Sequence, residues 1–266
     1  MQATYDILIT AGFNPDKPDP IKEITGVHHK VLAEVGGKPM VWHVVRAFEE
    51  SGLAGEIVIV GLGEEYALDF GRPVHYVENH ASLWRNFGAG LDALNSLGDP
   101  DRTVISTSAD SPLITAEMVR WFVNECQPVV KDLYWGVVRK ETMEATFPTS
   151  RRTYLPLREG RFCSGDLFLG SLSAAGRAYE KLHDFVVYRK STFHQMRLLG
   201  FGTLLRLIFR QLSLQGLLGV AERHLEITGT PVIVPYAELG MDVDKPIQYE
   251  LVQEYWAKHR GGERHG

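Results

Sequence analysis

Gly12, Lys30 and Asp110 are the residues whose type and position first suggest chemistry in this 266-residue sequence. Gly12 follows the short apolar run Ile7-Leu8-Ile9-Thr10, and a glycine there lets backbone N–H groups come close to a ligand. Lys30 ends a long polar loop, and Asp110 ends a second strand-like run. A strand, a glycine turn, a basic loop and a helix start together make a cradle for an anion such as a triphosphate.

Alternating strands and helices are expected to position these residues. Runs of apolar residues predict buried strands, and apolar residues at helical spacing predict helices. The expected strands cover 7–10, 56–61, 73–77 and 103–110, and the expected helices cover 41–51, 83–94 and, from an N-cap at Thr115, 115–126. Such βα units predict a Rossmann-like, doubly wound and mostly parallel α/β sheet that binds its ligand at the carboxyl ends of the strands. Gly12 and Asp110 both fall at such ends.

The other segments are less regular. Pro15, Pro18, Pro20 and Gly26 predict a loop without helix before Lys30, whereas Pro39 suits the first turn of the helix that begins near Met40. In the second half we expect strands at 132–139 and 231–235, a turn running into a strand at 163–170, and helices at 173–183 and 197–212. A basic loop or hairpin is expected at 147–162, and a last helix ends near 256. No repeat or low-complexity linker is present. We therefore expect a single domain over 1–266, with a helical and basic insertion around 147–225.

Composition limits the class of protein. With 44% hydrophobic residues the chain can bury one large core, and its formal net charge of -5 argues against a nucleic-acid coat. Two cysteines outside any CxxC pair favour a reducing compartment. No signal peptide and no apolar run of about 18 residues, the length of a membrane-spanning helix, is recognised, so a cytoplasmic protein without a transmembrane segment is expected.

Three segments resemble those of one family. Lys30-Val-Leu-Ala-Glu-Val-Gly-Gly-Lys-Pro-Met, Ala109-Asp110-Ser-Pro-Leu-Ile and Asp242-Val-Asp-Lys-Pro follow each other in the order and approximate spacing of MobA-like nucleotidyltransferases. That group includes molybdenum-cofactor guanylyltransferases and N-acetylglucosamine-1-phosphate uridylyltransferases. The resemblance implies their GT-A-like nucleotide-diphospho-sugar transferase fold. It also implies transfer of a nucleoside monophosphate from an NTP to a small anionic acceptor, usually a phosphate, with release of pyrophosphate.

The resemblance also assigns roles on the nucleotide side. Lys30 would meet the triphosphate as a point charge, and Asp110 with Asp242 or Asp244 would hold Mg²⁺, which Mn²⁺ could replace. The remaining nucleotide-binding positions implied are Ala11, Gly12, Lys38, Ser82, Asn86 and Gly88. Each has a plain alternative. Asp110 could cap the helix after Pro112, Asp242 and Asp244 could form a solvated turn, Ser82 could cap an ordinary helix, and Lys38 could simply be exposed.

Acceptor binding is expected in the second half. Arg151, Arg152, Arg158 and Arg161 form a basic cluster, of which Arg151 and Arg152 are the candidates for an anionic acceptor, and Gly165-Asp166 is similar to a turn that faces the acceptor in the family. A plain solvated hairpin is the alternative. The predicted helix 197–212 is apolar on most sides, which suits a buried helix, a homodimer interface or contact with a lipid phosphate.

One loop departs from the family pattern. Relatives carry an Arg-Met pair soon after the first strand, whereas Phe13–Lys22 contains no arginine. Lys17 or Lys22 could substitute, but a lysine cannot clamp a phosphate through two parallel hydrogen bonds. Two other functions stay open. One is a metal-dependent glycosyltransferase, because Asp242-Val-Asp244 has the Asp-x-Asp form. The other is a non-catalytic nucleotide-binding domain, which the missing arginine suggests.

Overall fold

A computed structural model describes residues 4–66, 68–99, 101–187 and 211–260 of the chain. An eight-stranded sheet has the order β10-β7-β9-β6-β1-β4-β5, with β8 paired to β9. The strands are β1 (Tyr5–Thr10), β4 (Ala54–Val60), β5 (His75–Val77), β6 (Thr103–Ser108), β7 (Leu133–Arg139), β8 (Leu155–Leu157), β9 (Gly160–Ser171) and β10 (Gly229–Val234). β9 runs antiparallel between β6 and β7, while the other neighbours along the main path are parallel. The mostly parallel α/β sheet is confirmed.

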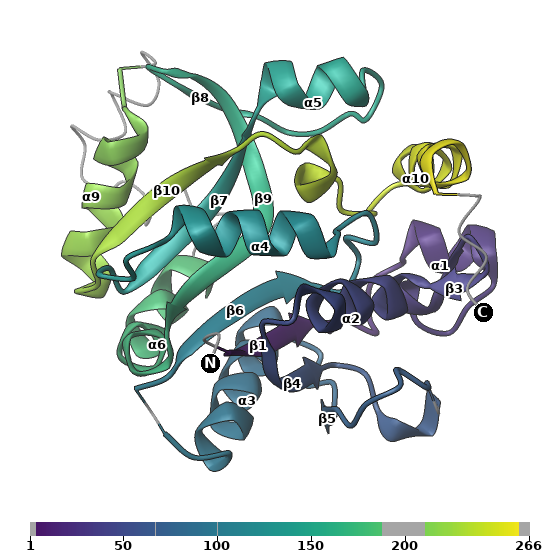
Figure 1. Ribbon diagram of the computed structural model, residues 1–266, viewed down its shortest axis with the longest axis horizontal. Coiled ribbons are helices and arrows are strands. Elements are labelled where there is room, and N and C mark those ends of the chain that lie inside the picture. Colours follow the sequence, from purple (N-terminus) through teal and green to yellow (C-terminus); the bar gives the residue numbers. More distant parts are fainter. Residues whose placement is uncertain (1–3, 67, 100, 188–210, 261–266) are drawn as a thin grey trace.

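Helices cover the sheet on two sides, and α2 and α4 lie side by side in front of it (Figure 1). The α-helices are α1 (Pro20–Thr25), α2 (Met40–Ser51), α3 (Leu83–Ser96), α4 (Ala116–Glu125), α5 (Lys140–Thr146), α6 (Leu172–Val187), α9 (Leu214–Leu225) and α10 (Pro246–His259). The shorter elements are the 3₁₀ helices η1 (Lys30–Leu32), η2 (Glu64–Tyr66) and η3 (Ala237–Gly240), and the two-residue strands β2 (Glu34–Val35) and β3 (Lys38–Pro39).

The central strands are buried on both faces, because successive side chains of a strand point to opposite sides. Ile7 and Ile9 of β1 belong to the large apolar cluster that also contains residues of α2 and α4. Leu8, between them, belongs to a second cluster with Leu91 of α3 and Leu172 at the start of α6. This explains why the first strand reads as a continuous apolar run rather than as an alternating one.

The expectation of no helix before Lys30 is wrong, because α1 occupies Pro20–Thr25. Pro20 stands in the first turn, where its missing N–H is not needed for a helical hydrogen bond. The Asp19 carboxylate caps the helix by accepting from the N–H groups of Ile21 and Lys22, at 2.9 and 3.4 Å. Gly26 ends it with φ of 74°.

The less regular half of the chain contains both confirmed and unexpected elements. The hairpin expected within 147–162 is the antiparallel pair β8–β9, and β9 extends through 163–170, where a turn leading into a strand was expected. α5 and α9 were not expected. The predicted helix 197–212 lies outside the described residues except for its last two, so this expectation and the surface roles attached to it stay predictions.

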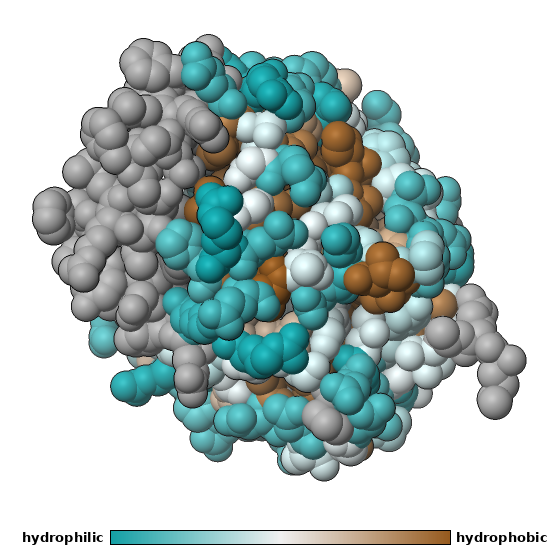
Figure 2. Space-filling view, turned by 90° about the vertical axis from the view of Figure 1, so that its left-hand side faces the viewer, coloured by the Kyte–Doolittle hydropathy of each residue, from teal (hydrophilic) through white to brown (hydrophobic). Residues whose placement is uncertain are grey.

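The surface of the described part is mixed in polarity. In the face shown in Figure 2, apolar residues form separate spots among polar ones, and the coloured atoms show no large continuous apolar area. None of the described helices combines the length and the apolar composition needed to span a membrane.

Candidate functional site

Gly12 and Asp110 lie at neighbouring strand ends. Thr10 of β1 pairs in parallel register with Ser108 of β6, and each candidate residue follows two positions later. The N–H of Ala109 donates to the carbonyl oxygen of Thr10 at 2.9 Å, so the two exits are held together just beyond the sheet. The position expected from the strand pattern is therefore confirmed for both residues.

The Lys30 ammonium group contacts both Asp110, after β6, and Asp244, before α10. Its Nζ forms an ion pair with Asp110 Oδ2 and donates to Asp244 Oδ1 at 2.8 Å. Burial lowers the pKa of Lys30, but the charges of Asp110 and Asp244 outweigh burial and hold that pKa above its ordinary value. The ammonium group thus stays charged and links residues that are 80 and 214 positions away along the chain.

His29 caps the short 3₁₀ helix η1, which begins at Lys30. It is buried, its Nε2 lies 2.9 Å from the carbonyl oxygen of Gly61, and its Nδ1 accepts from the N–H of Val31 at 3.4 Å. Burial lowers the pKa of His29, which favours the neutral ring. A neutral ring with its proton on Nε2 satisfies both contacts, so His29 caps η1 at the residue before Lys30.

Asp110 does not cap the following helix, so that alternative is wrong. Thr115 is the N-cap of α4 and accepts from the N–H of Met118 at 3.2 Å. Asp110 instead accepts from the Ser108 hydroxyl with one oxygen and contacts Lys30 with the other. A nearly buried carboxylate of this kind faces polar partners rather than the helix.

Asp242 and Asp244 differ in their surroundings. Asp242 is largely buried and forms an ion pair with Arg152, whereas the side chain of Asp244 is 57% exposed and contacts Lys30. Burial and the charge of Asp166 raise the pKa of Asp242 to about 8, even though Arg152 opposes the shift. For Asp244, burial raises the pKa but the charge of Lys30 outweighs it, and the result is a lowered pKa. The pair is therefore not a plain solvated turn.

Gly165 and Asp166 belong to β9 rather than to a separate turn. Asp166 adopts a positive φ of 43°, next to an irregularity in the β7–β9 pairing, and its Oδ2 accepts from the Ser111 hydroxyl at 3.1 Å. Burial, followed by the charge of Asp110, raises the pKa of Asp166 to about 6. Gly165 lies against the backbone of Gly136 in β7. Asp166 is thus the fourth carboxylate in this region, after Asp110, Asp242 and Asp244.

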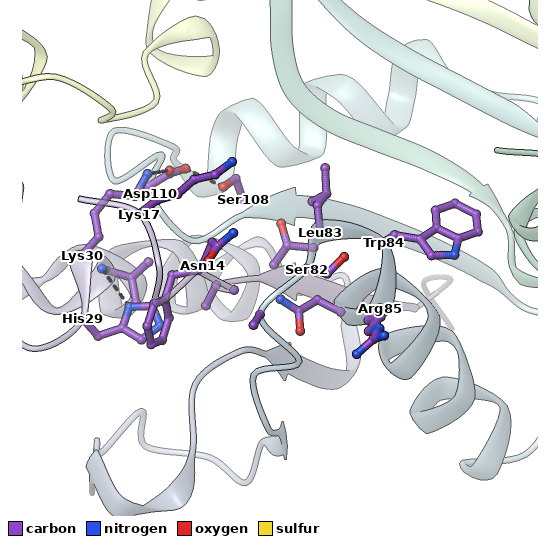
Figure 3. Close-up of a pocket in the computed structure, with 17 residues that line it drawn as sticks. Asn14, Lys17, His29, Lys30, Ser82, Leu83, Trp84, Arg85, Ser108 and Asp110 are labelled. Carbon is purple, nitrogen blue, oxygen red and sulfur yellow. Dashed lines mark hydrogen bonds and ion pairs between the residues drawn. The ribbon is translucent and has the colours of Figure 1, made fainter. Parts of the chain in front are cut away.

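A cavity of about 630 Å³ opens beside these groups. Lys30, Ser108 and Asp110 lie at one end of the lining, and Ser82, Trp84 and Arg85 lie at the other (Figure 3). Ala11, Gly12, Lys17 and Asn86 also line it. Ser82 precedes α3, but its side chain makes no capping hydrogen bond. One cavity is therefore lined by Gly12, Lys17, Lys30 and Asp110 together with Ser82 and Asn86, which were predicted to bind the nucleotide.

Asn79 is a residue of this site that the sequence did not single out. Its Nδ2 donates to the carbonyl oxygen of Phe13 at 2.9 Å, and its Oδ1 accepts from Asn86 Nδ2 at 3.0 Å. A Cβ at Gly12 would lie 1.8 Å from Asn86 Nδ2, so the chain needs glycine there. Asn86 is accordingly buried, and it connects the glycine turn to the loop before α3. An isolated asparagine in a loop carries no signal of a contact with Phe13, 66 residues away.

Eight of the predicted residues do not line this cavity: Gly165, Asp166, Asp242 and Asp244, described above, and Lys38, Gly88, Arg151 and Arg152. Lys38 lies with its Nζ over the Trp42 ring, 5.1 Å from the centroid. A Cβ on Gly88 would meet Tyr179 of α6 at 2.3 Å, so this glycine allows two helices to approach. Arg151, which is exposed, and Arg152 line a separate cavity of about 450 Å³.

Lys17 lines the main cavity, whereas Lys22, the other proposed substitute for the missing arginine, lies over the Phe13 ring at 5.0 Å. Lys17 is therefore the better placed of the two lysines for contact with a ligand in that cavity.

The chain matches the family model for the MobA-like NTP transferase domain over residues 25–213. Bifunctional protein GlmU from Exiguobacterium sp. (strain ATCC BAA-1283 / AT1b) is 37% identical over 90 residues, which make up 34% of this chain and 20% of that relative. GlmU from Latilactobacillus sakei subsp. sakei (strain 23K) is 39% identical over 89 residues, 33% of this chain and 19% of the relative. The chain thus matches only about a fifth of the length of these curated relatives.

Solved structures extend the likeness to the whole fold. A hypothetical transferase from Thermus thermophilus is 30% identical, with a TM-score of 0.78 over 94% of this chain and 99% of that one. A CMP:2-keto-3-deoxy-manno-octonic acid synthetase, solved in complex with CTP, is 15% identical with a TM-score of 0.60 over 96% and 99% of the two chains, so it supports the fold alone. Together with the family model, which covers more than half of the sequence, these matches show that the chain belongs to the MobA-like NTP transferase domain family.

Proposed function

We propose that the protein transfers a nucleoside monophosphate from an NTP to a small anionic acceptor, with release of pyrophosphate and with Mg²⁺ as the cofactor. The observation that carries the proposal is the convergence of Lys30, Asp110 and Asp244 beside the cavity of about 630 Å³. Family membership supports an NTP as the donor, and a structure with the same fold was solved in complex with the nucleotide CTP.

The chain offers its own groups for the triphosphate. The turn at Gly12 brings the backbone close to the cavity, while Lys17 and Lys30 supply positive charge at its lining. Lysine ammonium groups attract phosphate oxygens as point charges. The nucleoside would then extend toward Ala81 and Ser82, in the loop that precedes α3.

The acidic residues fit a divalent cation. Asp110 and Asp244 approach one cation, the Lys30 ammonium, from two distant segments of the chain. Within the described residues no group of three or more His, Cys, Asp or Glu side chains is arranged to hold a metal. Mg²⁺ does not require one, because it is usually held by one or two carboxylates together with water and substrate phosphates. We therefore assign Asp110 and Asp244 as the residues that would hold it.

When bound, Mg²⁺ would offset negative charge on the phosphate oxygens. The chain's residues would do the rest by positioning, which is the main requirement of phosphoryl transfer. An acceptor oxygen forms a bond to the α-phosphorus as the bond from that phosphorus to the oxygen shared with the β-phosphate breaks, and pyrophosphate leaves with the electron pair. A phosphate acceptor already carries an ionised oxygen at neutral pH, so no side chain has to remove a proton.

The acceptor is proposed to be phosphorylated because a net-acidic chain exposes Arg151 beside the cavity of about 450 Å³. Charge-assisted hydrogen bonds from arginine suit phosphate and carboxylate groups. Arg151 therefore remains the candidate for acceptor binding in this part of the molecule.

A pyrophosphate-release assay with each of the four NTPs, Mg²⁺ and a panel of phosphorylated sugars and hydroxy acids tests the proposal. Transfer predicts pyrophosphate only when the right NTP and acceptor are both present. Release of a nucleoside diphosphate from a nucleotide-sugar would instead support a glycosyltransferase. Nucleotide binding without turnover across the panel would support a non-catalytic domain, and either result would contradict the proposed reaction.

A further inference from the structure

Arg152 is directed into the protein rather than toward solvent. Its side chain is 12% exposed and forms an ion pair with Asp242, whose side chain is 17% exposed. The thiol of Cys163 lies beside it, and its positive charge also acts on Asp166. A largely buried guanidinium that is already paired with a carboxylate has little freedom to reach an external ligand.

The segment that Arg152 contacts is the one that carries Asp244. Val243, between the two aspartates, is fully buried, and its N–H donates to the carbonyl oxygen of Asp110 at 2.9 Å. Asp242 therefore connects to Arg152 on one side of Val243, and Asp244 connects to Lys30 on the other. A displacement of Asp242 would move Asp244 as well, because only one residue separates them.

Two further side chains, those of Gln248 and Lys245, connect loop 150–152 to the segment 242–245. Gln248, buried at the start of α10, donates to the carbonyl oxygen of Ser150 at 3.3 Å and accepts from the N–H of Asp244 at 2.9 Å. Lys245 Nζ donates to the carbonyl oxygen of Arg151 at 3.0 Å. Loop 150–152 and segment 242–245 thus form one connected unit, in which Arg152–Asp242 is the charged contact.

We propose that Arg152 is a positioning residue that anchors Asp242 and thereby holds Asp244 at the cation-binding position beside Asp110. The inference rests on the proposed function in one respect, which is that Asp244 holds a divalent cation. It differs from a role in acceptor binding, because the guanidinium acts through Asp242 and does not touch the substrate.

A titration of the nucleotide-free protein with Mn²⁺ tests this role without requiring turnover. The EPR signal of free Mn²⁺ reports how much of the metal is bound. Arg152→Met should raise the Kd for Mn²⁺ by about tenfold or more, the size of effect typical of residues that orient metal ligands. Arg152→Lys should restore part of the affinity, because lysine keeps the charge but not the forked geometry. Arg177→Met, which alters an exposed arginine paired with Asp132, should leave the Kd unchanged.

A double-mutant cycle separates anchoring from direct coordination by Asp242. If Asp242 acts only through its contact with Arg152, Asp242→Asn should weaken Mn²⁺ binding about as much as Arg152→Met, and the double variant should be no weaker than either. The double variant also removes both charges, so it guards against misfolding caused by one unpaired buried ion. Thermal unfolding of every variant confirms that folded protein is compared.

Unchanged Mn²⁺ affinity in folded Arg152→Met protein, or a double variant much weaker than both single variants, would overturn the anchor. A raised KM for the acceptor with unchanged Mn²⁺ affinity would also overturn it, in favour of acceptor binding. Failure of the proposed function looks different, because the wild-type protein would then release no pyrophosphate from any NTP, whatever the order of Mn²⁺ affinities.

Discussion

The N–H of Val243 donates a hydrogen bond to the carbonyl oxygen of Asp110 at 2.9 Å. This contact ties the segment after β10 to the end of β6, and it sets Asp110 and Asp244 close enough to share Lys30. A backbone contact is insensitive to the side chains that flank it. Substitution of an acidic side chain therefore does not in itself remove this backbone hydrogen bond.

Lys30→Met should have opposite effects on the two ligands. Affinity for the NTP should fall because the cavity loses a cation that stays charged at neutral pH. Affinity for Mn²⁺ in the nucleotide-free protein should instead rise, by about 5- to 150-fold if the ammonium competes with the metal for Asp110 and Asp244. Calorimetric titration of each ligand separately measures both effects.

Lys140→Met is the matched control, because Lys140 pairs with Glu144 on α5 and does not line the cavity. Weaker Mn²⁺ binding by Lys30→Met would argue against the idea that the ammonium occupies the metal position in the empty protein.

Gly12→Ala should damage the nucleotide cavity. The added methyl group would overlap the side-chain amide of Asn86, and overpacking of this kind typically costs about 1–3 kcal/mol of unfolding free energy. NTP binding should fall with it, because the glycine turn and Asn86 both line the cavity. Urea unfolding and nucleotide titration measure the two losses.

Gly176→Ala is the control for Gly12→Ala. A Cβ at Gly176 meets nothing within 4 Å, and alanine favours the helical conformation of α6. This variant should unfold at the same or a slightly higher urea concentration than the wild type. An equal loss of stability in both variants would mean that the close approach at Gly12 is unimportant.

The stability of the metal-free protein should depend on pH through Asp242 and Asp166. Their raised pKa values, about 8 and about 6, mean that the folded state binds protons more tightly than the unfolded state does. Their contribution to stability is fully present below pH 4, near the ordinary aspartate pKa, and is lost as the pH rises through about 6 and then about 8.

Unfolding temperatures of the wild type and of Asp242→Asn, recorded from about pH 5 to about pH 9, measure this contribution. This range includes both raised pKa values, about 6 and about 8. The difference between the two proteins should change with pH mainly near the higher value. Added Mg²⁺ should stabilise the wild type most at high pH, because metal ligands bind in their ionised form. A difference that does not vary with pH would contradict the raised pKa of Asp242.

The sequence predicted the sheet and the positions of Gly12 and Asp110 well, because buried parallel strands such as β1 and β6 have a strong local pattern. α1 was missed because Pro20 suggests a loop unless the Asp19 cap is considered with it. The inward direction of Arg152 could not be predicted, since its partner Asp242 is 90 residues away in the sequence. Asn79 was missed for the same reason, because its partner Phe13 is 66 residues away in the sequence.

Pyrophosphate release by Asp110→Ala, compared with the wild type, tests the central claim most directly. The account predicts release by the wild type that requires an NTP, an acceptor and Mg²⁺, and a fall of at least about 10²-fold in kcat for the variant, since the lost carboxylate supports charge stabilisation at the reacting phosphate. The unfolding temperature should show that the variant remains folded. Wild-type turnover by folded Asp110→Ala protein would contradict the account.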